Sequence, residues 1–415
     1  MTGAASRSKI IKFRIVRKLR RAMTTNRDPT PPRRSPPPRR VLIIPDKFKG
    51  TLTAREAAAA IAHGWRQIRR HDQLELVPMS DGGDGFGETL SQLLGAKKQT
   101  LATVDATHRP VRANWWWEPR SRTAIIESAR VVGLAQLPPG KFHPFDLDAF
   151  GLGAVLQAAA GKQARRCIIG IGGSATNDGG FGLARALGWK FFAANHRLLE
   201  RWTELDEVEK IQPPASPFAF GKTIVAVDVQ NPLLGRRGAT RIYGPQKGIR
   251  PMDIAKAEAC LGRLASICKK QFGDDAAKEP GTGAAGGLGF GLRRFLDAQL
   301  QSGFELFARH AELERRLDKI DLVITGEGAI DKSSLMGKGV GQIAALCRAR
   351  KIPCLGLAGV VKDARLARRH FKMVLGLTPE LTTEVEAKKN PVHWLKLAAM
   401  ELARKCRSCV CEDAG

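Results

Sequence analysis

Val41-Leu-Ile-Ile-Pro45 decides the fold class, because this short apolar run is followed at once by the signals of a helix and of a second strand. A run of this kind, ended by Pro, is typical of a strand that is buried on both faces. Thr53-x-x-Glu56 is a capping box and predicts an Ala-rich helix from there to about Arg70. Leu74–Pro78 has the pattern of the next strand. Strand, helix and strand in this order predict a βαβ unit of an α/β protein.

The middle of the chain changes to closely spaced strands. Val111–Trp117 and Thr123–Glu127 lie too close together for a helix between them. Ile320–Thr325, a helix after Gly337 and Pro353–Leu357 then return to alternating strand and helix. We therefore predict a doubly wound domain that is interrupted by an inserted smaller α/β domain. The predicted parts are a basic, Pro-rich disordered extension (1–40), the doubly wound domain (41–105 plus 285–405), the inserted domain (106–284) and a Cys-containing tail (406–415).

The 415-residue chain is strongly basic, with a formal net charge of +28. Residues 1–40 hold thirteen Lys and Arg against the single acid Asp28. A positive body attracts anionic small substrates as well as nucleic acid. Only 6% of the residues are aromatic, and no nucleic-acid-binding motif is found, so nucleic-acid binding is the less favoured alternative. No apolar run reaches the length of about 18 residues that a membrane span needs, so we expect no transmembrane segment.

The two ends of the chain carry features whose role the sequence leaves open. Residues 1–40 could be an organelle transit peptide, a stretch upstream of a true start at Met23, or a dispensable tail. The eight cysteines follow no secretory signal, which predicts reduced thiols in a cytoplasmic protein. Cys406, Cys409 and Cys411 could bind a soft metal, but no second cluster accompanies them.

Several glycine-rich or carboxylate-bearing segments follow predicted strands, where backbone amides can point at an anion. This placement favours phosphate chemistry. Phosphoryl transfer needs donors around the moving group, carboxylates for Mg²⁺, and a group that orients or deprotonates the attacking hydroxyl. Asp46-Lys-Phe-Lys-Gly50 offers two cations, Lys47 and Lys49, of which we prefer Lys49 for contact with a phosphate or a carboxylate.

Two further segments supply carboxylates and small donors. Ser80-Asp-Gly-Gly-Asp-Gly85 carries Asp81 and Asp84, which suit Mg²⁺ or substrate hydroxyls, although an ordinary Asp-Gly turn is the alternative. The stretch 170–180 places small polar residues between glycine pairs, so we interpret it as a phosphate cradle. It matches neither a Walker loop nor a dinucleotide-binding pattern. Asp178 within it is our candidate for catalytic base or metal ligand.

Four more segments lie farther along the chain. Tight packing turns are the alternative for the first three, and the fourth places two carboxylates after an apolar strand, as a ligand loop with a metal or nucleotide contact would. They are Asp228-Val-Gln-Asn-Pro232, Gly244-Pro-Gln-Lys-Gly248, Pro280-Gly-Thr-Gly-Ala-Ala-Gly-Gly287 and Thr325-Gly-Glu-Gly-Ala-Ile-Asp331, the last followed by Lys338.

Taken in order, these segments resemble the type I glycerate kinase family over residues 41–380. The motifs that carry the resemblance are Pro45-Asp-Lys-Phe-Lys-Gly50, Ser80-Asp-Gly-Gly-Asp-Gly85, Gly172-Gly-Ser-Ala-Thr-Asn-Asp-Gly-Gly180, Asp228-x-x-Asn-Pro-Leu233, Gly244-Pro-Gln-Lys-Gly248, Gly283-Ala-Ala-Gly-Gly287 and Thr325-Gly-Glu-Gly328. The resemblance implies a Rossmann/flavodoxin-like domain with an inserted α/β domain. It also implies ATP and Mg²⁺ as cofactors and phosphorylation of D-glycerate at the 2-hydroxyl, in a cleft between the domains.

The residue types and the resemblance together give a predicted site. The predicted catalytic residues are Asp178, Lys49 and Asp81, with Asp178 nearest the reacting hydroxyl. The predicted substrate- or phosphate-binding residues are Lys47, Gly82, Gly83, Asp84, Gly172, Gly173, Ser174, Thr176, Asn177, Asn231, Lys247, Gly286 and Gly287. The predicted nucleotide or metal contacts are Asp228, Glu327, Asp331 and Lys338. Glycerate and ATP are the predicted partners, and the sequence leaves open a homo-oligomer.

Some positions depart from the usual family pattern. They are Lys47, Asp84, Phe86, Asp148, Ala149, Gln230 and Ser333. An exchanged hydroxyl or carboxyl group changes which partner is left unpaired, so these changes could retune the substrate or weaken activity. A kinase for another small hydroxy acid therefore stays open as an alternative, and so does the position of glycerate that is phosphorylated.

Overall fold

The computed structural model describes residues 37–408 apart from 217, 219, 274 and 336–338. Arg39 onward belongs to one compact unit, which contains two main β-sheets with helices packed on them. The α/β class predicted from the sequence is therefore confirmed. Most of the predicted extension (1–40) lies outside the described residues, and so do Cys409 and Cys411 of the predicted tail.

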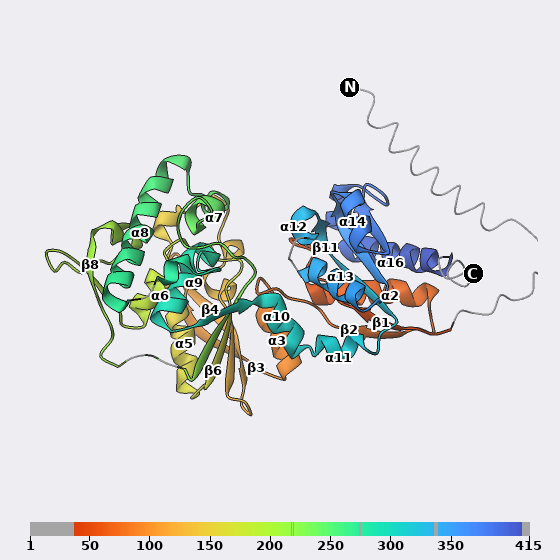
Figure 1. Ribbon diagram of the computed structural model, residues 1–415, viewed down its shortest axis with the longest axis horizontal. Coiled ribbons are helices and arrows are strands. Elements are labelled where there is room, and N and C mark those ends of the chain that lie inside the picture. Colours follow the sequence, from red (N-terminus) through yellow and green to blue (C-terminus); the bar gives the residue numbers. More distant parts are fainter. Residues whose placement is uncertain (1–36, 217, 219, 274, 336–338, 409–415) are drawn as a thin grey trace, which may run out of the picture. The chain divides into compact units, whose positions relative to one another are not determined.

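The first sheet is fully parallel and joins segments from the two halves of the chain (Figure 1). In spatial order its strands are β13 (Met373–Thr378), β12 (Cys354–Val361), β11 (Leu322–Ile330), β1 (Arg40–Ile43) and β2 (Gln73–Leu76). β1 lies between β11 and β2, with Val41 opposite both Leu322 and Leu74. The strands predicted at 41–45, 74–78, 320–325 and 353–357 are present, with ends that differ by a few residues.

Helices cover both faces of this sheet because successive residues of a strand point to opposite sides. Val41 and Ile43 share a core with α2 (Ala54–Ile68) and α16 (Pro391–Ser408), two helices that lie side by side. Leu42 and Ile44 share the opposite core with helices that cover the other face. Those helices are α10 (Gly303–His310), α11 (Leu313–Leu317) and α13 (Gly339–Ala349), with the shorter helices α12 (Lys332–Leu335) and α14 (Ala364–His370). The short helix α15 (Glu384–Lys389) instead packs into the first core through Ala387.

The second sheet is mixed. In spatial order its strands are β10 (Gln299–Ser302), β9 (Lys222–Val227), β6 (Arg166–Gly170), β5 (Thr123–Glu127), β4 (Pro110–Glu118) and β3 (Lys97–Val104). The first four strands run parallel, whereas β4 is antiparallel to both β5 and β3. The closely spaced strands predicted at 111–117 and 123–127 are confirmed.

The helices that accompany the second sheet carry most of the glycine-rich segments at their ends. They are α3 (Phe86–Leu94), α4 (Ala129–Val132), α5 (Leu152–Gly161), α6 (Phe181–Ala186), α7 (Ala239–Lys247), α8 (Ile254–Phe272) and α9 (Ala284–Phe295). A separate hairpin is formed by β7 (Lys190–Ala193) and β8 (Val208–Gln212).

The segment 325–331 differs from its prediction as a ligand loop after a strand. β11 continues through it, because Gly326, Glu327 and Ala329 pair with β12 at Leu357, Ala358 and Val360. The glycines are compatible with this extended pairing, since a Cβ at Gly326 would lie 2.1 Å from the Leu357 carbonyl oxygen. Close approach of the neighbouring strand, and not a turn, explains the glycine at this position.

Replacing Thr53 by Ala tests the start of α2. The Thr53 hydroxyl accepts from the Glu56 amide at 3.2 Å, and the Glu56 carboxylate accepts from the Thr53 amide at 2.9 Å. We expect Thr53→Ala to lower the free energy of unfolding by about 1 kcal/mol, since the Glu56 amide loses its acceptor. Thr53→Ser keeps the oxygen and should stay close to the original stability in chemical denaturation. Equal loss in both variants would contradict the capping role.

Candidate active site

Three loops converge next to the carboxyl ends of β1, β2 and β6. The Gly172 amide donates to the Gly82 carbonyl oxygen at 3.1 Å. A Cβ at Gly172 would lie 2.6 Å from the Cα of Gly83, and a Cβ at Gly83 would lie 2.9 Å from the Lys47 ammonium nitrogen. Such close backbone approach requires residues without a side chain. The glycines of the segments 80–85 and 170–180 therefore let the loop after β1, which carries Lys47, lie directly against them.

Lys47 lies among carboxylates. Its ammonium nitrogen is 3.9 Å from Asp81 Oδ1. Burial works against the charged form of Lys47, but the nearby carboxylates of Asp81, Asp46, Asp84 and Asp228 outweigh it and raise the pKa of Lys47. Lys47 is therefore a fixed positive charge at the point where these acids meet.

Asp46 is an acid that the sequence-based prediction did not include. It lies three residues beyond β1, and its carboxylate accepts the amide of Lys47 at 2.7 Å. Burial is the main cause that raises the pKa of Asp46 to about 7, and the negative charge of Asp81 adds to it. A carboxyl group with a pKa near neutrality can hold or release a proton at the working pH of an enzyme.

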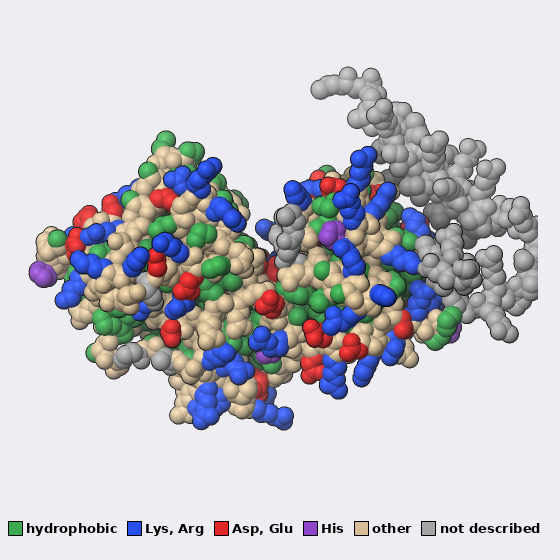
Figure 2. All heavy atoms as spheres, viewed as in Figure 1, with side chains coloured by type: hydrophobic (Ala, Val, Ile, Leu, Met, Phe, Trp, Pro, Cys, Tyr) green, Lys and Arg blue, Asp and Glu red, His purple; other side chains and the backbone are tan. Residues whose placement is uncertain are grey.

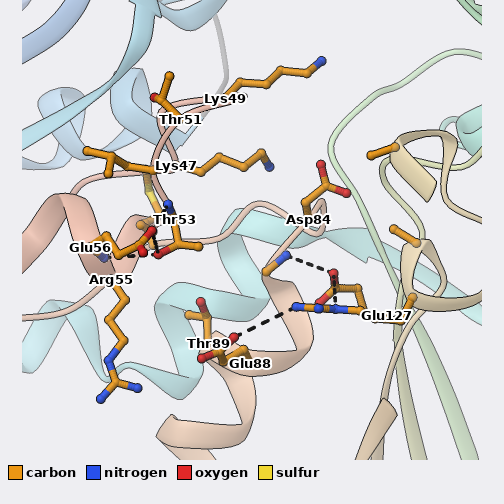
Figure 3. Close-up of a pocket in the computed structure, with 18 of the residues that line it drawn as sticks. Lys47, Lys49, Thr51, Thr53, Arg55, Glu56, Asp84, Glu88, Thr89 and Glu127 are labelled. Atoms are coloured by element: carbon orange, nitrogen blue, oxygen red, sulfur yellow. Dashed lines mark hydrogen bonds and ion pairs between the residues drawn. The ribbon is translucent and has the colours of Figure 1, made fainter. Parts of the chain in front are cut away.

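A cavity of about 440 Å³ opens beside these groups. Figure 3 shows the Lys47 side chain extending toward the Asp84 carboxylate, with the Lys49 side chain running to the same side but farther from Asp84 in this view. The polar residues that line the cavity include Lys47, Lys49, Asp84, Glu88, Arg130 and Gln136. Cations and acids thus face the same space, as is required for binding an anion together with a hydroxyl group.

Glu127 fixes one wall of this cavity. Its carboxylate is buried and accepts the amides of Gly85 and Gly87 at 3.0 Å each, which ties the end of β5 to the start of α3 (Figure 3). The Arg130 guanidinium lies 3.2 Å from Glu127 and 4.0 Å from Glu88. Because Glu127 orients one edge of Arg130, the other planar donors of this guanidinium are suited to a carboxylate or a phosphate.

Asp178 lies away from this cavity, in the interior of the second sheet's layer. Its side chain has no exposed surface, and its two oxygens accept the amides of Ala149 at 2.9 Å, Gly182 at 2.9 Å and Gly180 at 3.2 Å. Burial first, and then the charge of Asp148, raise the pKa of Asp178 to about 6. A carboxylate with three backbone donors holds the cradle segment in shape.

Lys247 is the second buried charge of this region. Its ammonium group donates to the Thr176 carbonyl oxygen at 2.6 Å. Burial lowers the pKa of Lys247 to about 7, although the negative charge of Asp178 opposes the shift. A Cβ at Gly286, where φ is +70°, would lie 2.0 Å from the same carbonyl oxygen. The predicted members Lys247, Thr176 and Gly286 are therefore in contact.

The other small polar members of the cradle are also buried. The Ser174 and Thr176 hydroxyls lie 2.9 Å apart, and Nδ2 of the Asn177 side chain donates to the Thr240 hydroxyl at 3.0 Å. The side-chain oxygen Oδ1 of Asn177 is buried without a hydrogen-bond partner among the described residues. Gly287 packs its own backbone against Gly179, with a built Cβ only 2.8 Å from the Gly179 Cα. These residues form a closed cluster, and of the cradle segment only Gly172 and Gly173 reach the surface.

The remaining predicted contacts occupy other places. Asp228 is exposed and close enough to Lys47 to influence its charge, whereas Asn231 accepts the Tyr243 hydroxyl at 2.6 Å. Glu327, on β11, acts electrostatically on Asp46. Asp331 lies 3.7 Å from the Lys362 ammonium group. Lys338 and the Ser333 side chain lie outside the described residues.

The departures from the family pattern have structural settings of their own. Phe86 is buried against Gly170, where a built Cβ would lie 2.4 Å from its ring. The Ala149 amide bonds to Asp178, and Asp148 lies 3.0 Å from His108. Gln230 is exposed. Lys47 and Asp84 alone among these departures line the main cavity within the described chain.

The described residues contain neither a ready-made metal cluster nor a membrane-spanning helix. No three His, Cys, Asp or Glu side chains stand close enough together to hold a metal ion without further ligands. None of the helices in the described ranges combines the length and apolar character needed to cross a bilayer. Cys406, the described member of the predicted metal-binding tail, accepts the Arg39 guanidinium at 3.2 Å.

The sequence-based prediction missed Asp46, Glu127 and Arg130. Asp46 and Glu127 each come at or just beyond the carboxyl end of a buried strand, which is where ligand loops of α/β proteins lie. That position was a usable signal for Asp46. No local signal marks Arg130, because its role depends on Glu127 and on the loop at 85–87.

An α/β fold that gathers glycine turns, carboxylates and lysines at the ends of parallel strands suits a kinase of small molecules. The chain belongs to the glycerate kinase family, whose model matches residues 41–407. It is 33% identical to a glycerate kinase of Halalkalibacterium halodurans over 88% of this chain and 97% of that protein. It is 37% identical to the glycerate 2-kinase of Escherichia coli K12 over 78% of this chain and 86% of that protein.

A solved structure has a similar fold. It is the crystal structure of a Salmonella typhimurium LT2 protein assigned as glycerate kinase 2, with a TM-score of 0.75 and 31% identity. The match covers 90% of this chain and 99% of the Salmonella chain. The sequence-based resemblance to the glycerate kinase family is thus confirmed.

The replacement Lys247→Met tests whether burial of the Lys247 ammonium group makes the stability of the protein depend on pH. The folded-state pKa of about 7 lies below the ordinary value of 10.5, so the unfolded chain binds more protons between these pH values. Lys247 therefore makes the original protein gain stability as pH rises from about 7 toward 10, by at most about 1.4 kcal/mol per pH unit. The difference in unfolding free energy between the protein and Lys247→Met should follow that slope in denaturant titrations. A pH-independent difference would contradict the buried, destabilised charge.

Proposed function

We propose that this kinase transfers the γ-phosphoryl group of ATP directly to D-glycerate in the cavity beside Lys47. The observation that carries the proposal is the meeting of Lys47 with Asp46, Asp81 and Asp84, of which Lys47 and Asp84 line a 440 Å³ cavity, within a glycerate kinase family chain. The cavity walls come from loops after β1, β2 and β5, which supports binding in a cleft between the two sheet-containing parts.

The cations of the cavity suit the negative groups of both reactants. Lys47 carries a stabilised positive charge, and Arg130 is oriented by Glu127, so these two are our candidates for the glycerate carboxylate and the transferred phosphate. Lys49, which we preferred from the sequence, lines the same cavity but is exposed, and we assign it a supporting contact with phosphate. Asp46 is our candidate for accepting the hydroxyl proton, because it lies half-buried next to Lys47 and its pKa of about 7 suits proton transfer.

The residues present fit a Mg²⁺ ion. Mg²⁺ uses one or two carboxylates and completes its coordination with water and substrate phosphates, so a preformed cage of three acids is not required. Asp81, Asp84 and Asp228 all act on Lys47 and are the candidates for holding the ion. When bound with ATP, the ion would neutralise developing negative charge on the phosphates. Glu327 and Asp331 remain candidates for the nucleotide side of the site.

We also propose a positioning role for Asp178. Its three backbone donors and its complete burial keep the segment 174–182 in the shape that presents Gly172 and Gly173 to the loop 80–85. The same segment is also held by contacts within a buried cluster, which consists of Lys247, Thr176, Asn177 and Gly286. A phosphate cradle would then be formed by the glycine turn at the surface.

The order of the first sheet supports a flavodoxin-like domain with an insertion. Numbered among themselves, its strands run 2-1-3-4-5, and the second sheet lies in sequence between the second and third of them. Cytoplasmic location and self-association stay predictions from the sequence.

Phosphorus NMR of the product tests the proposed function. Purified protein with ATP, Mg²⁺ and D-glycerate should yield a phosphoglycerate, and we propose the 2-phosphate, in line with the relative named glycerate 2-kinase. Lys47→Gln should lower kcat/KM by about 100-fold, because a fixed charge at the transferred group is lost. Lys319→Gln, an exposed lysine on another surface, is the matched control and should keep full activity.

Two results would contradict this assignment. Full activity of Lys47→Gln would remove Lys47 from the site. Turnover of another small hydroxy acid, with none of D-glycerate, would favour the alternative substrate that the changed residues Lys47 and Asp84 allow.

Asp178→Asn separates positioning from proton transfer. The new amide group presents N–H donors to backbone N–H groups, so we expect a loss of about 1–3 kcal/mol in unfolding free energy. Turnover per folded molecule, measured well below the melting temperature, should fall by less than about tenfold, since no reacting proton is involved. Unchanged stability together with a loss of several orders of magnitude in kcat would show that Asp178 is the base after all.

A further inference from the structure

One end of the second sheet carries a row of cations, which we call the basic edge. It lies at the lower end of β3 and β6 in the view of Figure 1, where blue side chains gather in Figure 2. Its members are Lys97, Lys98, Arg120, Arg122, Lys162, Arg165, Arg166 and Lys222.

Strand register puts these residues in a row. Thr123 of β5 is opposite Arg166 of β6, and Arg166 is opposite Lys222 of β9. On the other side, Lys97 of β3 pairs with Trp117, next to the turn that contains Arg120 and Arg122. Four strand intervals separate β3 from β9, so the row is about 19 Å long.

The members of the basic edge lack ion-pair partners among the described residues. All of its members except Arg122 are exposed, and none forms an ion pair with an acid of the described residues. The local acid Glu118 is buried and accepts the amides of Arg120 at 2.9 Å and Ser121 at 2.6 Å, and the positive charge of Arg120 also helps to lower the pKa of Glu118. Arg122 donates to Gln163, which is neutral. Like charges in a row repel each other, and an anion would relieve this.

The positive potential extends to the next helix. His310 of α10 has a lowered pKa, caused first by burial and then by the charges of Arg166 and Arg309. The charge of Arg166 therefore contributes to the lowered pKa of His310, after burial.

We propose that the basic edge binds the phosphate backbone of a nucleic acid. Four of the eight members are Arg, whose planar donors match phosphate oxygens. An anionic membrane is the less suitable partner, because surfaces that bind membranes usually also insert apolar side chains. Within the described chain, the large exposed apolar residues all lie elsewhere.

This binding surface is separate from the proposed kinase site. The basic edge lies at the amino ends of β5, β6 and β9, whereas Glu127, Gly170 and Asp228 lie at their carboxyl ends. Nucleic-acid binding would therefore be a second activity of the chain, and its test does not depend on glycerate turnover.

The test compares two variants of the full chain that lose the same charge. The edge variant is Lys98→Gln, Arg120→Gln, Arg165→Gln and Lys222→Gln. The control variant is Lys319→Gln, Lys351→Gln, Arg365→Gln and Arg368→Gln, four exposed cations on the surface of the first sheet's helices and turns. Using the full chain keeps the basic residues 1–36 present in every sample, and equal melting temperatures would show that each variant is folded.

Fluorescence anisotropy with labelled 20-nucleotide single-stranded RNA, and with DNA of the same sequence, measures binding at several salt concentrations. We expect the edge variant to bind at least about tenfold more weakly, with a log–log salt slope that is shallower by about 0.7 for each phosphate that the edge no longer neutralises. The control variant should stay close to the original affinity. Weakening of RNA alone or of DNA alone would identify the form that is bound.

Three results would overturn the proposal. Equal weakening in both variants would show a response to net charge alone. The second result is that the original protein binds neither oligonucleotide. The third is that it binds only to phosphatidylserine vesicles.

Discussion

Close approach of glycine backbones is the constraint on which the rest of the site depends. Gly172 packs on Gly83, and Gly303 packs on Asp81, where built Cβ atoms would lie 2.6 Å and 1.8 Å from backbone atoms. The Gly172 amide then bonds to Gly82. Because both neighbours of the loop 80–85 lack side chains, this loop can be held between β6 and α10. Its acids Asp81 and Asp84 thereby reach Lys47.

Electrostatic balance follows from this packing. Lys47 offsets the repulsion among the acids around it, and those acids offset the cost of partly burying its charge. In the interior beside the second sheet, Asp178 and Lys247 are also oppositely charged groups that lie near each other, but their main partners are backbone groups. The outer cluster faces a cavity and can exchange its partners for a ligand, whereas the inner cluster is closed and stabilises the turn above it.

Much of the fold followed from local signals in the sequence. The strand at 41–45 and the capping box at Thr53 could be predicted because burial and helix capping act over a few residues. The glycine segments were recognised, but their depth was not, since Gly173 is exposed whereas Asp178, five residues later, is fully buried. Arg130 escaped prediction because Glu127 orients it through contacts made only after folding.

A crystal structure of the protein with D-glycerate and a non-hydrolysable ATP analogue with Mg²⁺ would decide whether Lys47 and Asp46 form the reacting site. We expect the glycerate carboxylate or the terminal phosphate within hydrogen-bond distance of the Lys47 ammonium group, with a hydroxyl of glycerate facing Asp46. Glycerate bound elsewhere, with Lys47 still paired only to Asp81 and its neighbouring acids, would contradict this assignment.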